Sequence, residues 1–120
     1  MRVFPRLGSR RAPKTPADAD RRALQQLQAL GADLTKPRHV IHFVYFADEE
    51  AARRAAEEIE AAGYSIAVVS PDERFREWRV HADAVRVVGE TTIDGFRSWF
   101  EHLATTYGGE YDGWEAARTP

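Results

Sequence analysis

The sequence predicts one α+β domain in which a four-stranded antiparallel sheet carries two helices on one face and follows an N-terminal helix. Segments rich in β-branched and aromatic residues alternate with segments whose apolar residues recur every three to four positions. Glycine, proline or a capping side chain separates these segments. A chain of 120 residues suits a single domain that buries about two thirds of its unfolded surface.

The first 17 residues predict a disordered basic arm, because they contain three prolines and scattered arginines without hydrophobic periodicity. Residues 1–22 carry seven basic and two acidic side chains, whereas residues 23–120 carry ten basic and seventeen acidic ones. The chain is therefore divided into an arm, residues 1–17, and an acidic domain, residues 18–120. The charge of the domain favours a basic partner.

The first half of the domain predicts a helix, a strand and a second helix. The first helix runs from about Asp18 to Leu30 and ends at Gly31. Residues 38–46 form a strand that is apolar on both faces and therefore lies in the middle of its sheet. Asp48 caps a helix over residues 49–62, whose inward stripe consists of Ala51, Ala55, Ile59 and Ala62.

The second half predicts two strands, a helix and a last strand. The strands cover residues 64–69 and 77–88, with a turn at residues 70–73 and a bulge near Ala82-Asp83. Residues 91–94 resemble a capping box, and Gly108-Gly109 ends the helix that follows. Residues 111–118 form the closing strand. The order βαββαβ is the ferredoxin-like plan, whose second sheet face is expected to be partly open.

The search for catalytic and cofactor motifs yields little. The chain has no cysteine, no glycine-rich phosphate loop and no nucleophile elbow. His39 and His42 are separated by an odd offset on a strand, which sends them to opposite faces and argues against a shared zinc ion. We expect no metal, no cofactor and no enzymatic activity.

Composition also bears on partners and location. No apolar run approaches the roughly 18 residues of a membrane span, and the first residues lack the apolar core of a signal peptide, so a cytoplasmic protein is expected. The acidic domain lacks the aromatic-basic run of an RNA recognition motif. Direct nucleic-acid binding by the domain is therefore not expected.

Three stretches resemble the regulator of ribonuclease E activity B (RraB-like) family. They are the leading helix with residues 31–34 and 36–38, the strand 39–46 with Asp48 and Ala51-Ala52, and the acidic, aromatic motif at residues 109–115. The similarity extends over residues 18–116. It implies a ferredoxin-like, non-catalytic protein that binds a ribonuclease E-type endoribonuclease, inhibits it and thereby modulates RNA turnover.

The C-terminal motif is the predicted partner-binding site, together with the open face of the sheet. Large aromatic side chains with a carboxylate rim suit the guanidinium groups of an arginine-rich segment. The predicted anchors are Tyr111 and Trp114, the predicted rim is Glu110, Asp112 and Glu115, and the first strand adds His42, Phe43 and Tyr45. The main role of the same residues is expected to be structural, as a capped helix that leads into an edge strand with a buried tryptophan, and the two roles can coexist.

Two other functions remain open at this point. One is a small-ligand-binding or catalytic domain with a pocket near His42 and Trp78, which a buried cleft and a shifted pKa would favour. The other is RNA binding by the basic arm together with the sheet, which predicts a steep salt dependence.

Overall fold

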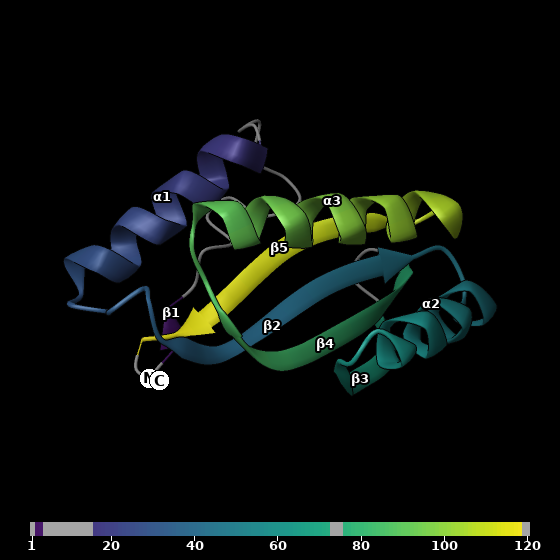
Figure 1. The fold of residues 1–120 in the computed structure, drawn as a ribbon. Coiled ribbons are helices and arrows are strands. Elements are labelled where there is room, and N and C mark those ends of the chain that lie inside the picture. The colour runs from purple at the N-terminus through teal and green to yellow at the C-terminus, as the bar shows by residue number, and fades with distance from the viewer. Residues whose placement is uncertain (1, 4–15, 73–75, 119–120) are drawn as a thin grey trace.

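The computed structural model describes residues 2–3, 16–72 and 76–118. The helices and strands are β1 (Arg2–Val3), α1 (Pro16–Ala29), β2 (Pro37–Phe46), α2 (Glu49–Ala61), β3 (Ser65–Asp72), β4 (Glu77–Val87), α3 (Glu90–Thr106) and β5 (Glu110–Ala117). The strands form one antiparallel sheet in the order β1-β5-β2-β4-β3, and the helices lie along it (Figure 1).

The predicted α+β class and the N-terminal helix are confirmed, but the predicted number of four strands is wrong. The fifth strand, β1, pairs with β5 through Arg2↔Ala117 and Val3↔Ala116. Most of the predicted disordered arm, residues 1–17, falls outside the described residues. The parts that are described are β1 and the start of α1.

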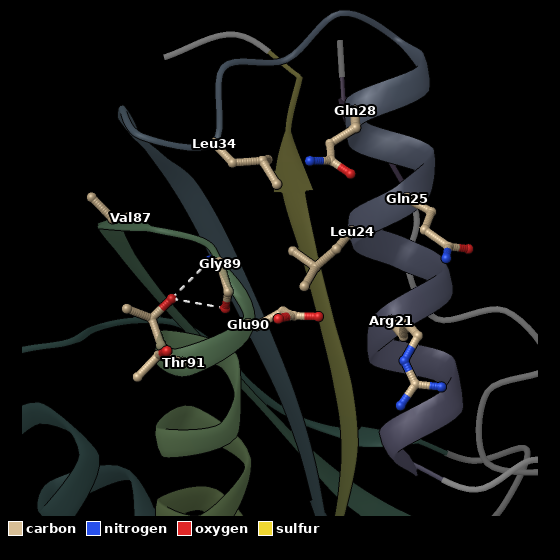
Figure 2. A pocket seen from close by; sticks show the side chains of 10 residues that line it. Arg21, Leu24, Gln25, Gln28, Leu34, Val87, Gly89, Glu90 and Thr91 are labelled. Atoms are coloured by element: carbon tan, nitrogen blue, oxygen red, sulfur yellow. Dashed lines mark hydrogen bonds between the residues drawn. The ribbon is translucent and has the colours of Figure 1, made fainter.

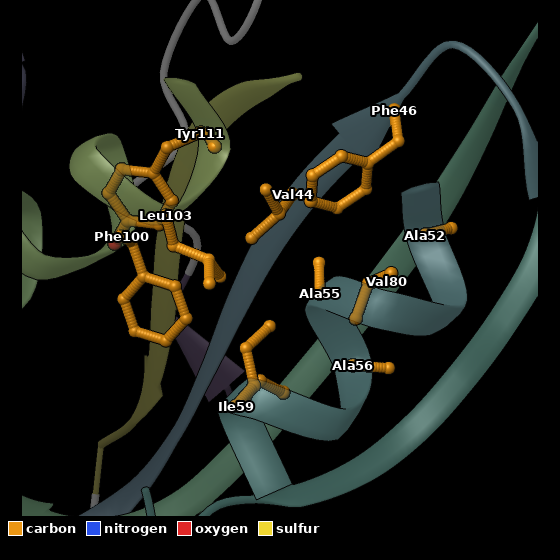
Figure 3. Packing of buried hydrophobic residues seen from close by; sticks show 12 residues of the cluster. Val44, Phe46, Ala52, Ala55, Ala56, Ile59, Val80, Phe100, Leu103 and Tyr111 are labelled. Atoms are coloured by element: carbon orange, nitrogen blue, oxygen red, sulfur yellow. The ribbon is translucent and has the colours of Figure 1, made fainter. Parts of the chain in front are cut away.

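The central strand β2 organises the core. It lies between β5 and β4, as its two apolar faces predicted. The helices α2 and α3 pack against Val44 and Phe46 (Figure 3), while α1 packs against Val40 and Trp114. All three helices therefore share the face that carries the even-numbered side chains of β2, since successive strand residues point to opposite faces.

The opposite face of the sheet differs from the expected open surface. Phe43 and Tyr45 point to that side, yet each side chain is only 5% exposed. The prediction of an accessible aromatic surface is therefore wrong at these two residues. In the same face, the ring of His81 meets Phe43 edge-on at a centroid distance of 4.6 Å.

The helix α2 begins where the sequence predicted. The side chain of Asp48 accepts a hydrogen bond from the backbone N–H of Ala51 at 2.9 Å, which satisfies one of the unpaired donors of the first turn. The predicted inward stripe is partly wrong: Ala51 is half-buried and Ala62 is exposed. Alanine occupies so many positions of this helix that the pattern does not select one stripe. The buried residues are Ala52, Ala55, Ala56 and Ile59.

The hairpin of β3 and β4 corrects two details. Residues 70–72 were predicted as a turn, but they pair with β4 through Ser70↔Arg79, Pro71↔Trp78 and Asp72↔Glu77. Pro71 is tolerated because β3 is the last strand of the sheet, so its missing N–H breaks no ladder on a second side. The register shift lies between Ile66 and Val68 of β3, across from the position predicted in β4.

The helix α3 begins slightly earlier than predicted. Its N-cap is Gly89, whose N–H donates to the Thr92 hydroxyl at 2.8 Å, and that hydroxyl donates back to the Gly89 carbonyl at 3.1 Å (Figure 2). The helix ends at Thr106, and Gly108 follows with a φ of +69°, a conformation that glycine adopts without strain. The double glycine thus ends the helix as predicted.

Gly109 is required for a close approach between backbones. A Cβ atom at this position would overlap the carbonyl oxygen of Tyr45 and the ring of Phe46, both in the central strand. We expect Gly109→Ala to lower the free energy of unfolding by about 2 kcal/mol, as overpacking typically does. Gly95→Ala is the matched control, because a Cβ there meets nothing within 4 Å and alanine favours a helix. Urea denaturation of both variants tests this, and equal stabilities would contradict it.

Candidate functional site

The C-terminal motif contains a β-bulge that determines where its side chains point. In the pairing with β2, Phe43 lies opposite Gly113 and Val44 lies opposite Tyr111, which leaves Asp112 as an extra residue. Gly113 has a φ of +101°, as a bulge of this kind requires. Tyr111 and Trp114 are three positions apart and would face opposite sides of a regular strand. The bulge brings both onto the helix-covered face.

The two aromatic residues of the motif are core residues. Trp114 is 1% exposed and Tyr111 is 8% exposed. The ring of Tyr111 stacks on Phe100 of α3 at a centroid distance of 5.2 Å with an angle of 13°. Burial raises the pKa of Tyr111 well above its usual range, so its hydroxyl stays protonated. Neither aromatic surface is available to a partner in this structure.

A buried ion pair ties the motif to two helices. Arg97 of α3 donates two hydrogen bonds to Asp20 of α1, from Nε at 2.7 Å and from Nη2 at 2.9 Å. The indole N–H of Trp114 donates to the same carboxylate at 2.9 Å, and the Arg97 guanidinium lies 5.0 Å above the ring of Tyr111. A fork of this kind gives both strength and fixed geometry. One carboxylate thus joins α1, α3 and β5.

His42 belongs to the same buried region. Its Nδ1 atom shares a hydrogen bond of 2.8 Å with the hydroxyl of Tyr111, and its ring stacks on Phe100 at 4.3 Å. Burial, reinforced by the charges of Arg97 and Arg86, lowers the pKa of His42 to about 3, so the ring is neutral. Its Nε2 atom is buried without a hydrogen-bond partner. The low pKa therefore reflects a core position and not a reactive cleft.

The carboxylates of the motif are distributed unevenly. Glu110 is exposed and Asp112, at the bulge, is half-buried, whereas Glu115 is 7% exposed. Glu110 and Glu115 pair with Tyr45 and Ile41 of β2 and so lie on the face opposite the helices. Seven of the eight residues predicted as one site are thus separated onto two faces, and the eighth, Asp112, is the extra residue of the bulge. His42, Tyr111 and Trp114 lie on one face, and Phe43, Tyr45, Glu110 and Glu115 lie on the other.

A second buried arginine was not predicted. Arg38 is fully buried at the start of β2 and donates to the carbonyls of Ala117 at 3.0 Å and Arg118 at 2.6 Å, and to the Asp33 carbonyl. It fastens the loop after α1 to the end of β5. The signal in the sequence is parity, because Arg38 shares the face of Val40 in β2. The same reasoning applies to Asp20, which lies on the helical stripe of Ala23, Leu24 and Leu27.

The structure contains a cleft of about 540 Å³ beside α1 (Figure 2). Leu24 of α1 and Leu34 of the following loop point into it, and Glu90 of α3 lies across from Arg21. A second cleft of about 610 Å³ lies between α2 and Tyr107. Neither is lined by His42 or Trp78, around which the alternative ligand pocket was predicted.

The described residues also bear on metal binding and on membrane spanning. Among them, no three His, Asp or Glu side chains are grouped so as to hold a metal ion. His39 and His42 do point to opposite faces, and His39 lies 3.5 Å from Asp83. No helix in the described ranges is both long and apolar enough to cross a membrane.

Comparison with known proteins yields one family. Residues 17–116 match the family model described as RraB, regulator of ribonuclease activity B. The match includes α1, which carries Asp20, and most of β5, which carries Tyr111 and Trp114. No curated protein sequence matches the chain.

Proposed function

The chain belongs to the family of regulators of ribonuclease activity B, and on that premise we propose that it binds and inhibits an RNase E-type endoribonuclease without catalysing a reaction. The observation that carries this proposal is the family match over residues 17–116. The ferredoxin-like plan is proposed for β2 to β5 with α2 and α3, and the strand order β5-β2-β4-β3 supports it.

In the proposed mechanism, a folded acidic surface of the chain binds a basic segment of the ribonuclease and thereby inhibits it. Residues 23–120 carry seventeen acidic and ten basic side chains, which favours a basic protein segment over a phosphate backbone. Of the predicted site residues, Glu110 and Asp112 are proposed to contact the partner, because they are exposed and half-buried respectively. We propose that Tyr111 and Trp114 hold β5 in place. The other four predicted residues are proposed to support β5: Glu115 from within that strand, and His42, Phe43 and Tyr45 from the neighbouring β2.

The test is a cleavage assay with a purified RNase E-type endoribonuclease and a fluorescently labelled RNA. We expect the full chain to slow cleavage in proportion to its concentration and to saturate near one equivalent. Inhibition should occur without any complex between the chain and the RNA, because the proposed target is the enzyme. Glu110→Gln with Asp112→Asn should raise the concentration for half inhibition about 10-fold, equivalent to about 1.4 kcal/mol.

The controls separate this function from nonspecific charge effects and from RNA binding. Glu49→Gln with Glu50→Gln removes the same charge from α2, where both carboxylates already pair with arginines, and should leave inhibition unchanged. If the chain alone retards the labelled RNA in a mobility-shift assay and high salt abolishes this effect, RNA binding is favoured instead. Absence of any inhibition or complex with the enzyme would refute the proposed function.

A further inference from the structure

The helix α3 leaves part of a large aromatic side chain exposed. Trp99 of α3 is 38% exposed, whereas its neighbour Phe100 is fully buried. One face of Trp99 meets Tyr64, with ring centroids 6.1 Å apart and an angle of 30°. Exposed tryptophans are the side chains most enriched in the centres of protein interfaces. Trp99 is therefore a candidate anchor on the helical side of the molecule.

Trp99 lies along a seam between α2 and α3. Tyr64, which follows α2, contacts Trp99, and further along α3 the hydroxyl of Tyr107 donates to Glu58 of α2 at 2.8 Å. The cleft of about 610 Å³ lies at the Tyr107 end of this seam. Trp99 and Tyr107 are eight residues apart, a distance of about 12 Å along a helix. That length suits about four residues of an extended peptide.

The charges along the seam favour a cation. In the first half of α2, Arg53 pairs with Glu49 at 2.7 Å; Arg54 lines the cleft beside Tyr107, and its charge is already paired with Glu50 at 2.9 Å. The second half carries three glutamates, and its last turn contains no basic residue. Acidic groups at the negative end of the helix dipole are unfavourable, and a bound cation would relieve this repulsion. The glutamates concerned are Glu57, Glu58 and Glu60.

The protein itself shows the contact that an arginine would make here. The guanidinium of Arg86 lies 5.2 Å above the ring of Tyr64, and that of Arg97 lies 5.0 Å above the ring of Tyr111. Within the described residues, Trp99 receives no such arginine. Tryptophan is the strongest partner for a cation over its face.

We propose that the seam between α2 and α3 binds an arginine-bearing segment of the ribonuclease, with one guanidinium on Trp99 and another at Glu57 and Glu58, which both line the cleft beside Tyr107. This inference rests on the proposed function and specifies where the partner docks. Glu110 lies on the face of the sheet opposite the helices, so the seam is a contact separate from the one proposed at Glu110. Arginine is favoured over lysine because its planar group both stacks and forms paired hydrogen bonds.

A peptide titration tests the site. The probe is a fluorescein-labelled nine-residue peptide of alternating arginine and alanine, with a lysine version for comparison, measured by fluorescence anisotropy. We expect Trp99→Ala to weaken binding of the arginine peptide about 10-fold, and Glu57→Gln with Glu58→Gln to weaken it by a similar factor. The lysine peptide should bind several-fold more weakly. Circular dichroism of each variant checks that it is folded before its binding is compared.

The matched control is again Glu49→Gln with Glu50→Gln, which removes the same net charge from the paired end of the same helix. Less than a twofold change is expected. Equal weakening by the two double variants would show that net charge alone attracts the peptide and would overturn the inference. Full binding by Trp99→Ala would do the same.

The cleavage assay then separates the two proposals. Loss of inhibition in Trp99→Ala and in Glu57→Gln with Glu58→Gln, with inhibition retained in the control, supports docking at the seam. Inhibition by the wild type that neither seam variant weakens would overturn the docking site and leave the ribonuclease function intact. Failure of the wild type to inhibit would overturn the function itself.

Discussion

Replacing Asp20 with alanine is expected to lower the free energy of unfolding by about 3 kcal/mol, the cost of leaving one member of a buried ion pair alone. The side chains of Arg97 and Asp20 are 15% and 9% exposed, so solvent cannot replace the lost carboxylate fully. The substitution also leaves the indole N–H of Trp114 without its acceptor. Because the carboxylate joins three elements, the loss should appear as reduced cooperativity of unfolding as well.

Urea denaturation of Asp20→Ala, Arg97→Ala and the double variant measures this effect as a thermodynamic cycle. The double variant is expected to be less destabilised than the sum of the single ones, since the two groups act on each other. Asp18→Ala, on the same helix, removes a carboxylate whose ion pair with Arg21 spans 3.5 Å and is over half exposed. Its cost should stay below about 1 kcal/mol. Additive effects of the Asp20 and Arg97 variants would contradict the coupling.

The second large effect expected is a loss of stability in acid that depends on His42. Its pKa in the folded protein is about 3, below the ordinary value of 6.5, so between these values the unfolded chain binds more protons than the folded one. The contribution of neutral His42 is therefore complete above pH 6.5 and declines as the pH falls toward 3. From pH 7 to pH 4 this amounts to about 3 kcal/mol.

The measurement compares unfolding free energies of the wild type and His42→Gln between pH 7 and pH 4. Glutamine keeps a group that can hydrogen-bond to Tyr111 but does not titrate, so the variant should lose about 3 kcal/mol less than the wild type over this range. His102→Gln replaces an exposed histidine of α3 and should follow the wild type. Parallel curves for the wild type and His42→Gln would show that the imidazole is not buried in its neutral form.

The parts of the fold that the sequence predicted are those with local signals. The apolar residues of β2 placed it in the middle of the sheet, and Asp48 marked the start of α2. The double glycine marked the end of α3, where Gly108 takes a positive φ. In each case, one residue or a short pattern is sufficient because the physical cause lies within a few positions.

The parts that failed depend on distant neighbours. The regular alternation of a strand places Tyr111 and Trp114 on opposite faces, and only the bulge at Gly113 reverses this. A glycine inside a strand was the available signal. Asp20 and Arg97 sit on the inner stripes of their helices, but 77 positions separate them, so the pairing itself could not be read from the sequence.

The motif that is most distinctive in the sequence therefore functions mainly as internal structure. Tyr111 and Trp114 lie in the core. Gly109 permits a close approach to Tyr45, and Gly113 forms the bulge. The docking seam proposed above lies along α2 and α3, where the charged and alanine-rich sequence of α2 resembles an ordinary solvated helix. Only the packing reveals that Trp99 lies beside Tyr64 on that surface.

Arg38 sets a minimum length for the domain. Its buried guanidinium uses the carbonyls of Ala117 and Arg118, so a chain shortened before these residues would leave a positive charge inside the protein with fewer acceptors. Exopeptidase trimming that reaches this point would therefore unfold the end of β5 instead of merely shortening a tail. The stability of the domain therefore depends on whether the residues that accept hydrogen bonds from Arg38 are still present.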